Sequence, residues 1–160
     1  MVEWTTIPVT PETKEILEKL KKRYKIATYD ELIREMVAPG ESVTLDLSRT
    51  VSAKTGILWN ENYREVPFDG IINQITLHFP KGCNGLVWVR IGVSGKRGLI
   101  WICPREGFIA LDDTTQTYAM QYPVEKGDRI VAEINNYDEL YSHTIGIVVG
   151  IIKRPFVYRI

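Results

Sequence analysis

The sequence predicts an α+β chain in which a small strand-helix-helix module precedes an antiparallel β-sandwich. Three observations carry this prediction. Two segments before residue 38 have apolar residues at helical spacing, and a helix-start signal precedes each segment. After Pro39-Gly40 this spacing stops, and short β-branched and aromatic runs separated by turn residues follow. The 160-residue length suits a small module, residues 1–38, joined to one domain, residues 43–160.

Composition and charge are those of an ordinary globular chain. Apolar residues make up 44% and charged residues 25%. Lys and Arg number 20, as do Asp and Glu, so no net field attracts a polyanion. No apolar run reaches the roughly 20 residues of a membrane span, and the start MVEWTTIPV lacks the features of a secretory signal. We therefore expect no membrane partner and a cytoplasmic location. Scarce Gln with plentiful Ile, Lys, Glu and Tyr favours a heat-adapted source.

Residues 5–9 alternate like a strand, and two helices are expected after them. Thr10-Pro11 combines a hydroxyl N-cap with proline at the first helical position. Thr28 and Glu31 form a capping box that starts the second helix. Each helix has one apolar stripe and is too short to be stable alone, so we expect a second copy to cover the stripes. The expected dimer core is Ile7, Val9, Leu17, Leu20, Leu32, Ile33 and Met36.

The order strand, T-P-E-T, helix, T-Y-D-E-L-I-R, helix across residues 4–38 resembles the ribbon-helix-helix family. The resemblance implies a dimer in which two strands form an antiparallel ribbon and four helices share a core. It also implies a DNA contact, with outward ribbon residues in the major groove and the second helix's N-terminus at a phosphate. The residues that would contact DNA are Thr6, Lys21, Lys22, Arg23 and Thr28.

Residue chemistry favours dimerisation over DNA binding in this module. The outward ribbon residues Trp4, Thr6 and Pro8 include none of the Arg, Lys, Asn and Gln side chains that usually read bases, and Pro8 has no side-chain hydrogen-bonding group. Basic and acidic residues balance within the module, whereas phosphate binding normally needs a basic surplus. The basic residues 19–25 also suit a helix C-terminus without any DNA. DNA stays an alternative partner.

The rest of the chain reads as short strands separated by explicit turns such as Asn84-Gly85 and Lys126-Gly127-Asp128. In the segment 71–79, alternation places Ile71, Asn73, Ile75, Leu77 and Phe79 on one face. Half-buried strands at short intervals predict an antiparallel sandwich, with a jelly roll and another Greek key as equivalent choices. The candidate strands are residues 43–47, 55–59, 71–79, 86–93, 98–102, 107–111, 117–122, 129–134, 144–152 and 156–160.

Residues 66–152 are similar in pattern to single jelly-roll proteins of phage and virus particles. The supporting segments are FPKGCNGLVWVRI (79–91), IALDD (109–113), VEKGDRIVAEINN (124–136) and SHTIGIVV (142–149). The resemblance implies a sandwich that packs against neighbouring copies or a shell. It adds the virion to the cytoplasm as an expected location.

No residue pattern predicts catalysis. His78, on an outer strand face, and His143, in or beside a loop, each lack a second ligand at metal spacing. Asp112-Asp113 is interpreted as a solvated turn rather than a cation site. Glu133 is a lone carboxylate with no acid/base counterpart, and no G-x-S-x-G, P-loop or dinucleotide-binding motif occurs. We expect no enzyme, no catalytic residue, no metal and no cofactor.

Cysteines and aromatic residues are interpreted as structural first. Cys83 and Cys103 are too few for a disulfide framework and lie in apolar sequence, so we expect two buried thiols. Aromatic residues are numerous, and exposed rings can bind carbohydrate, although core or subunit contacts are the simpler interpretation. The aromatic residues in question are Trp59, Trp88, Trp101, Tyr118, Tyr122, Tyr137 and Tyr141.

Three functions remain open at this point. The first is a non-enzymatic, self-assembling structural protein whose N-terminal module holds a dimer together. The second is a ribbon-helix-helix transcriptional regulator, in which the sandwich oligomerises or senses a ligand. The third is a carbohydrate- or receptor-binding sandwich. Neutral charge and the ribbon's side chains count against DNA, so we favour the first and expect a homo-oligomer.

Overall fold

Both helices begin at the predicted capping residues. The computed structural model describes residues 10–37 and 40–154. Helix α1, Pro11–Tyr24, follows the N-cap Thr10, whose hydroxyl accepts from the Thr13 N–H at 3.3 Å. Helix α2, Tyr29–Val37, follows Thr28, whose hydroxyl accepts from the Glu31 N–H at 3.1 Å. The predicted strand 5–9 and the predicted stop at Pro39 lie outside the described residues.

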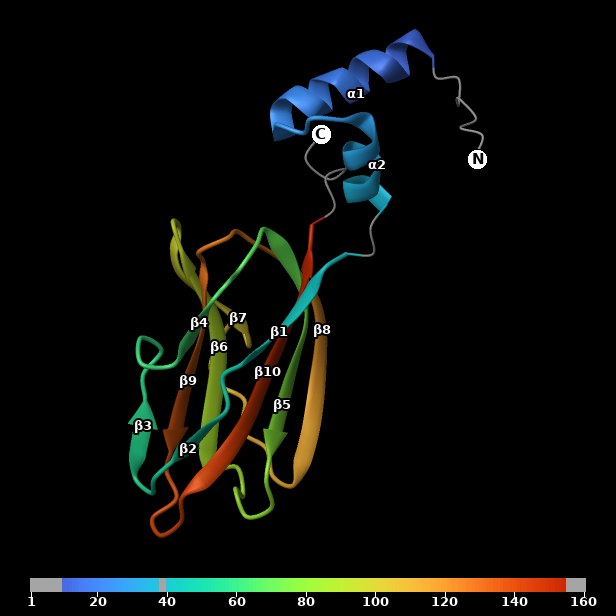
Figure 1. Cartoon of the computed structure of the whole chain (residues 1–160). Helices are drawn as coiled ribbons and strands as arrows, with labels where there is room; N and C mark the ends of the chain where they lie inside the picture. The colour runs from blue at the N-terminus through green and yellow to red at the C-terminus, as the bar shows by residue number, and fades with distance from the viewer. Residues whose placement is uncertain (1–9, 38–39, 155–160) are drawn as a thin grey trace. The chain divides into compact units, whose positions relative to one another are not determined.

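After the helices, the chain forms a sandwich of two antiparallel sheets over Gly40–Arg154, which is a compact unit of its own (Figure 1). The first sheet contains, in spatial order, β1 (Ser42–Asp46), β10 (His143–Lys153), β5 (Gly70–Phe79) and β8 (Thr114–Val124), with β2 (Arg49–Val51) also paired to β10. The second contains β3 (Thr55–Ile57), β9 (Arg129–Asn136), β6 (Val87–Gly95) and β7 (Gly98–Cys103), with β4 (Tyr63–Glu65) also paired to β9.

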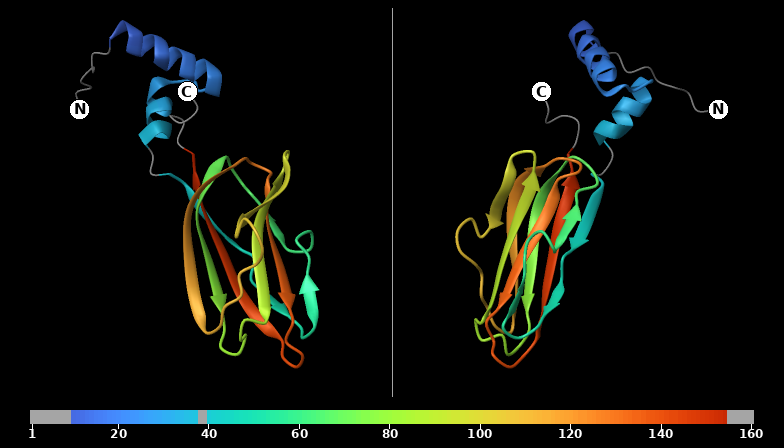
Figure 2. Two further views of the ribbon diagram at one scale, coloured as in Figure 1. Left: turned by 180° about the vertical axis from the view of Figure 1, so that it is seen from behind. Right: turned by 90° about the vertical axis from the view of Figure 1, so that its left-hand side faces the viewer.

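This strand order is that of a jelly roll. The chain crosses repeatedly from one sheet to the other, so most neighbours within a sheet are distant in sequence (Figure 2). The first and last strands of the sandwich pair with each other, from Ser42 opposite Ile152 to Asp46 opposite Val148. The structure therefore decides between the jelly roll and the other Greek-key sandwich that the strand pattern alone left equivalent.

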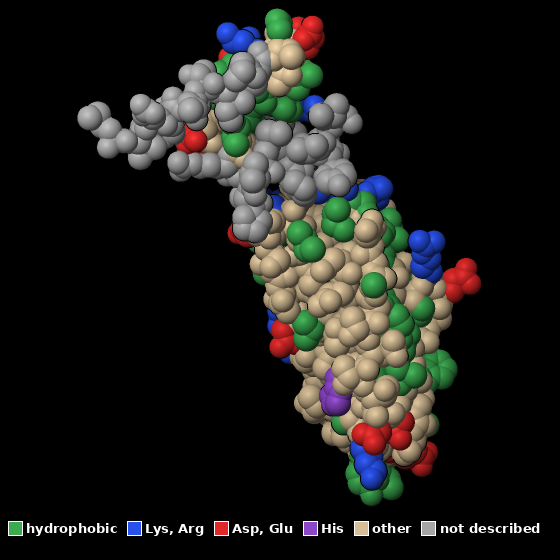
Figure 3. All heavy atoms as spheres, turned by 90° about the vertical axis from the view of Figure 1, so that its right-hand side faces the viewer, with side chains coloured by type: hydrophobic (Ala, Val, Ile, Leu, Met, Phe, Trp, Pro, Cys, Tyr) green, Lys and Arg blue, Asp and Glu red, His purple; other side chains and the backbone are tan. Residues whose placement is uncertain are grey.

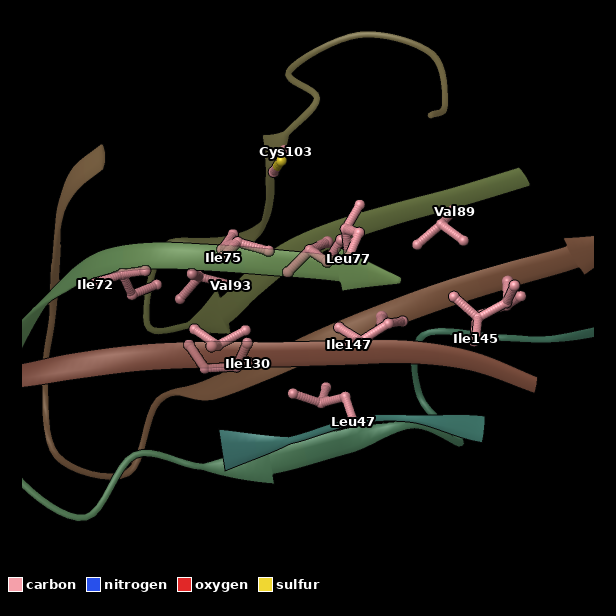
Figure 4. Packing of buried hydrophobic residues seen from close by; sticks show 14 of the residues in the cluster. Leu47, Ile72, Ile75, Leu77, Val89, Val93, Cys103, Ile130, Ile145 and Ile147 are labelled. Carbon is pink, nitrogen blue, oxygen red and sulfur yellow. The ribbon is translucent and has the colours of Figure 1, made fainter. Parts of the chain in front are cut away.

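The core lies between the two sheets and consists of alternate aliphatic side chains (Figure 4). In β10, Ile145, Ile147, Val149 and Ile151 are all fully buried and face inward. The inward residues of β6 and β9 meet them from the second sheet. Full burial of each such side chain contributes about 1.5 to 3 kcal/mol to folding, so this alternation is the main source of stability.

Strict alternation in the predicted strand 71–79 is wrong at its beginning. Against β10, Gly150 lies opposite Gln74 and Ile151 lies opposite Ile72, so Asn73 is an extra residue in β5, which marks a β-bulge. Ile72 is therefore buried and Ile71 only half-buried, the reverse of the prediction, whereas the alternation from Ile75 onward is as predicted. One extra residue moves every side chain before it to the other face.

One further strand prediction is wrong, and two strands were not predicted. Residues 107–111 form no strand, and only Ile109 makes a β-bridge, to Val89. The three-residue strands β2 and β4 were not predicted, because three residues are too few to show a period of two. The predicted strand 156–160 lies outside the described residues.

The buried amide of Asn136 ties three segments together at one end of the sandwich. Its Nδ2 donates to the carbonyl oxygens of Val51 at 3.1 Å, Ser52 at 3.2 Å and Tyr141 at 2.9 Å. Its Oδ1 accepts from the Asp138 N–H at 2.9 Å. One side chain thus satisfies backbone groups of the β2–β3 connection and of the β9–β10 loop.

We expect Asn136→Ala to lower the free energy of unfolding by about 2 to 4 kcal/mol, because buried backbone groups lose their partner. Urea unfolding followed by fluorescence measures the change. Asn60→Ala, at an exposed turn position, is the matched control and should stay within about 0.5 kcal/mol of the unsubstituted chain. Equal effects of both substitutions would contradict the assigned role.

Candidate interaction surfaces

The helical unit leaves apolar side chains exposed. Leu32 is fully buried, whereas Leu17 and Leu20 are half-buried. Ile16 is 52% exposed and Ile33 is 50% exposed. Of the other predicted dimer-core residues, Ile7, Val9 and the side chain of Met36 lie outside the described part. The described stripe is therefore only partly covered within one chain.

Of the predicted DNA-contacting residues, some have structural roles and others are exposed to solvent. The Lys21 ammonium lies 4.2 Å from the centre of the Tyr29 ring, whose hydroxyl donates to the Glu18 carboxylate. Lys22 and Arg23 are exposed in the last turn of α1. Thr28 caps α2, and Thr6 lies outside the described residues.

The start of α2 is already occupied by acidic groups. Asp30 and Glu31 lie in its first turn, and the Glu31 carboxylate accepts from the Ala27 N–H at 3.3 Å. Carboxylates at this position use the helix dipole and donors that a DNA phosphate would need. The local chemistry therefore counts against a phosphate contact at Thr28.

An aromatic cluster lies on the outer face of the second sheet, formed by Trp88, Arg90, Trp101, Phe108 and Tyr137. Trp88 is 41% exposed, and Tyr137 is 55% exposed. Their ring centres are 5.0 Å apart in an edge-to-face arrangement, and the Phe108 ring lies 5.8 Å from Trp88. The Trp88 indole N–H donates to the Gly85 carbonyl oxygen at 3.1 Å, which holds the ring in place.

Arg90 connects the two ends of this aromatic cluster. Its guanidinium carbon lies 3.9 Å from the centre of the Trp101 ring and 4.5 Å from that of Phe108. The same guanidinium donates to the nearly buried Glu133 carboxylate at 2.9 Å. Glu133, a lone carboxylate in the sequence, is thus half of an ion pair that orients Arg90 over the rings.

Gly92 makes room for the Trp101 ring in the aromatic cluster. A Cβ atom at residue 92 would lie 2.9 Å from Trp101 Cε3, closer than side chains tolerate. Trp88, Trp101 and Tyr137 are among the aromatic residues that the sequence points to, and the structure brings them together. Phe108 is not predicted, because its position depends on the Ile109–Val89 bridge rather than on any local pattern.

The remaining aromatic residues do not join the aromatic cluster. Tyr118 and Tyr122 lie on the inner side of β8 and pack against the core. Trp59 lies in a turn and Tyr141 in the β9–β10 loop.

The outer face of the first sheet is almost free of charge. Hydroxyl groups bond across the strands, Thr76 to Thr117 at 3.0 Å and Thr50 to Thr144 at 2.7 Å. Figure 3 shows charged side chains mainly at the margins of the sandwich face that it presents. We call the outer face of the first sheet the uncharged face, although Asp46, opposite Val148, places a carboxylate at the end of its marginal strand β1. Its other outward residues include Ser42, Thr44, Thr50, Gln74, Thr76, His78, Thr115, Thr117, Ala119, Gln121, Thr144 and Val148.

His143 lies beside the β9–β10 loop, as predicted. It is the first residue of β10, is buried, and its Nε2 lies 2.8 Å from Asp138 Oδ2. Hydrogen bonds from the Leu140 N–H, from His143 and from the Tyr141 N–H lower the pKa of Asp138. The pair closes the β9–β10 loop. His78 lies on the outer face, as predicted, and contacts the Thr115 hydroxyl at 2.8 Å.

Other side chains that could react or bind a metal ion have structural roles. Asp112 Oδ1 accepts from the N–H groups of Gly82 at 2.8 Å and Asn84 at 3.0 Å, so it caps that turn. Cys83 and Cys103 are free, buried thiols, and burial raises the pKa of each to about 11. Residues 10–37 and 40–154 contain no group of three or more His, Cys, Asp or Glu side chains placed to hold a metal ion. None of the helices in those ranges is long and apolar enough to cross a membrane.

No family model and no curated protein matches this chain. Among solved structures, it is similar to the infectious bursal disease virus VP2 subviral particle, with a TM-score of 0.49 and 11% identity over 76% of this chain and 34% of that chain. The Gx strain of the same virus gives a TM-score of 0.47 and 11% identity over 72% and 33%. The cyanophage Pam1 capsid asymmetric unit gives a TM-score of 0.43 and 15% identity over 73% of this chain and 88% of that chain. The chain spans about a third of the bursal disease virus chains, and at these scores the matches carry no argument about function.

We expect both thiols to resist a disulfide-type thiol reagent at pH 8 in the folded protein. With a pKa of about 11, each thiol has only a small thiolate fraction at that pH, and burial also blocks access. After denaturation in guanidinium, both cysteines should react at once, which serves as the control. Rapid modification of either residue in the folded chain would indicate an activated thiol and would contradict a purely structural role.

Proposed function

We propose that this chain is a non-enzymatic, self-assembling structural protein. In this proposal its helical unit pairs with that of a second copy, and its sandwich makes further contacts. The observation that carries the proposal is the open apolar stripe of the helices. Ile16 and Ile33 are about half exposed, and Leu32 is the one fully buried large apolar side chain among the described helical residues.

Energetics support this pairing. Helix α1 has 14 residues and α2 has 9. Isolated helices shorter than about 12 to 15 residues are marginal in water, and helices in proteins depend on burial of an apolar face. Covering an isoleucine contributes up to about 1.5 to 3 kcal/mol. A second copy would supply that cover symmetrically, because each chain offers the same stripe.

The sandwich contributes two surfaces with the composition of protein interfaces. Interface centres are depleted in charge and enriched in Trp, Tyr, Phe and Arg. The uncharged face has the first property, and the aromatic cluster has the second. Residues 66–152 share their pattern with single jelly-roll proteins of phage and virus particles. We therefore propose that the chain assembles in a virus-like or phage-like particle.

The chemistry of the described residues also supports a non-enzymatic role. The ring of His143 is bonded to Asp138 within the loop, and the Cys83 thiol is buried with a raised pKa. Glu133 is paired with Arg90. These three groups therefore each have a structural partner or are buried.

Carbohydrate binding is less well supported by the aromatic cluster. Successive sugar rings stack best on a flat platform of coplanar aromatic rings. The Trp88 and Tyr137 planes meet at 65°, and those of Trp88 and Phe108 at 42°. The rings thus form an uneven surface, which suits interdigitation with protein side chains.

We expect the double substitution Ile16→Asp with Ile33→Asp to lower the mass of the particle in solution, to half if the helices make its only contact. Charge at both exposed stripe positions would oppose pairing of the helices. Light scattering coupled to gel filtration measures the mass. Lys14→Ser with Lys22→Ser changes the net charge equally at exposed positions of α1 and should leave the mass unchanged. The same mass for both variants would rule out helical pairing.

DNA binding is the alternative that the exposed basic end of α1 favours. If it operates, a gel-shift assay will show binding that weakens steeply between two salt concentrations, because phosphate contacts release counterions. Lys21, Lys22 and Arg23 to Ala would then abolish the shift. We expect instead no shift at physiological salt, since the acidic start of α2 opposes a phosphate.

A further inference from the structure

Strand β8 is a long edge strand with one open side. It has 11 residues and pairs with β5 along its whole length, from Thr114 opposite Phe79 to Val124 opposite Gly70. Among the described residues, no strand pairs with its other side. Figures 1 and 2 show it at the lateral margin of the first sheet. Its outer row of backbone N–H and C=O groups is therefore available to another strand.

The composition of β8 does not protect this edge. Its sequence, TTQTYAMQYPV, contains no charged residue, although 25% of the chain is charged. Proteins normally guard open edges with lysines, prolines, bulges or short strands. Here such features lie only towards the end of the strand: Pro123, and an extra residue of β8 between Ala119 and Tyr122, where three residue steps of β8 lie opposite two of β5. Other marginal strands of the sandwich are much shorter, five residues in β1 and six in β7.

The side chains of β8 are also incompletely covered. Tyr118, Met120 and Tyr122 face inward and pack against the core, but all three are only half-buried. On the other side of the strand, Thr117 and Ala119 are exposed parts of the uncharged face. A strand added beside β8 would cover the inward residues further and would extend the uncharged face without bringing charges together.

We propose that a second copy of this chain supplies that strand, with its β8 antiparallel to the first across a two-fold axis. An antiparallel strand pair is self-complementary, so two identical edges satisfy each other completely. Pro123 lacks an N–H and ends the ladder, so residues 114–122 form it and Tyr118 lies on the axis. The two five-stranded sheets then become continuous.

This register makes the contacts specific. Tyr118 lies opposite its own symmetry mate on the inner side, as an aromatic cross-strand pair. Thr117 lies opposite Ala119 of the second copy, and Ala119 opposite Thr117, both on the outer side. The inference deepens the proposed self-assembly, but it uses a different surface from the helical stripe, so either contact can exist without the other.

The test is a set of full-length chains compared by light scattering. Thr117→Lys with Ala119→Lys places like charges opposite each other twice. It should reduce the unsubstituted chain to dimers, and the Ile16→Asp, Ile33→Asp background to monomers. Ser42→Lys with Thr44→Lys adds the same charge at exposed positions of β1, the other margin of the sheet, and should leave the mass unchanged.

A mixing experiment separates a lost contact from a lost fold. A chain with Thr117→Glu and Ala119→Glu should also fail to pair with itself, yet mixing it with the lysine variant should restore the paired mass, because opposite charges then meet at both positions. Restored mass together with slower hydrogen exchange of the amides in residues 114–122 supports the register.

Several outcomes would overturn the β8 pairing. The pairing is wrong if lysines on β8 leave the mass unchanged in both backgrounds, if they act no differently from lysines on β1, or if the mixture does not recover the paired mass. If the unsubstituted chain is a monomer and its β8 amides exchange without protection, self-pairing is rejected. A strand of another protein is then the remaining partner for this edge. An effect of the β8 variants without any effect of Ile16→Asp and Ile33→Asp would reject the helical pairing and retain the strand pairing.

Discussion

The structure depends on the burial of alternate aliphatic side chains between two sheets. Each long strand turns one row inward, as β10 does with Ile145, Ile147, Val149 and Ile151. Because side chains alternate with a period of two, a single inward row also determines which residues face outward. The bulge at Asn73 in β5 shows how strictly this holds, since the register adjusts so that aliphatic residues stay inside. Everything that this sandwich can offer a partner therefore lies on its two outer faces, its edges and its loops.

The two outer faces differ in a way that burial alone does not require. Charged side chains would keep either face hydrated, and charged residues are mostly exposed in folded proteins. Instead the first sheet presents hydroxyl and amide groups that bond to one another across the strands, and the second presents rings held by Arg90 and Glu133. Holding an arginine over two rings restricts a flexible side chain, and a surface with no partner would gain little from that order. Low charge and ordered rings are the composition of protein interfaces, which is why both faces enter the proposed self-assembly.

Symmetry connects the possible contacts. The proposed helical pairing and the proposed β8 pairing would both be two-fold contacts, and they would use separate parts of the chain. Two different two-fold contacts on one chain generate either a closed, even-numbered ring or an open array, depending on whether their axes meet. A structural protein with both contacts would extend by repetition of one chain, without a second component. The edge strand would then be protected by assembly rather than by the lysines that guard most edges.

Local chemistry was sufficient to predict the helices and most strands. Thr10 and Thr28 start helices because a hydroxyl beside free N–H groups is favourable wherever it occurs. Tertiary structure alone decided what depends on distant neighbours. Strand order, the bulge in β5 and the Asp138–His143 pair follow from pairing between remote segments, which no local window contains. The same holds for the aromatic cluster, since Phe108 reaches Trp88 through the Ile109–Val89 bridge, and for the open edge of β8, which exists because the sheet ends there. Periodicity predicts which face of a strand is apolar, but only the completed sheet determines which strand is left without a neighbour.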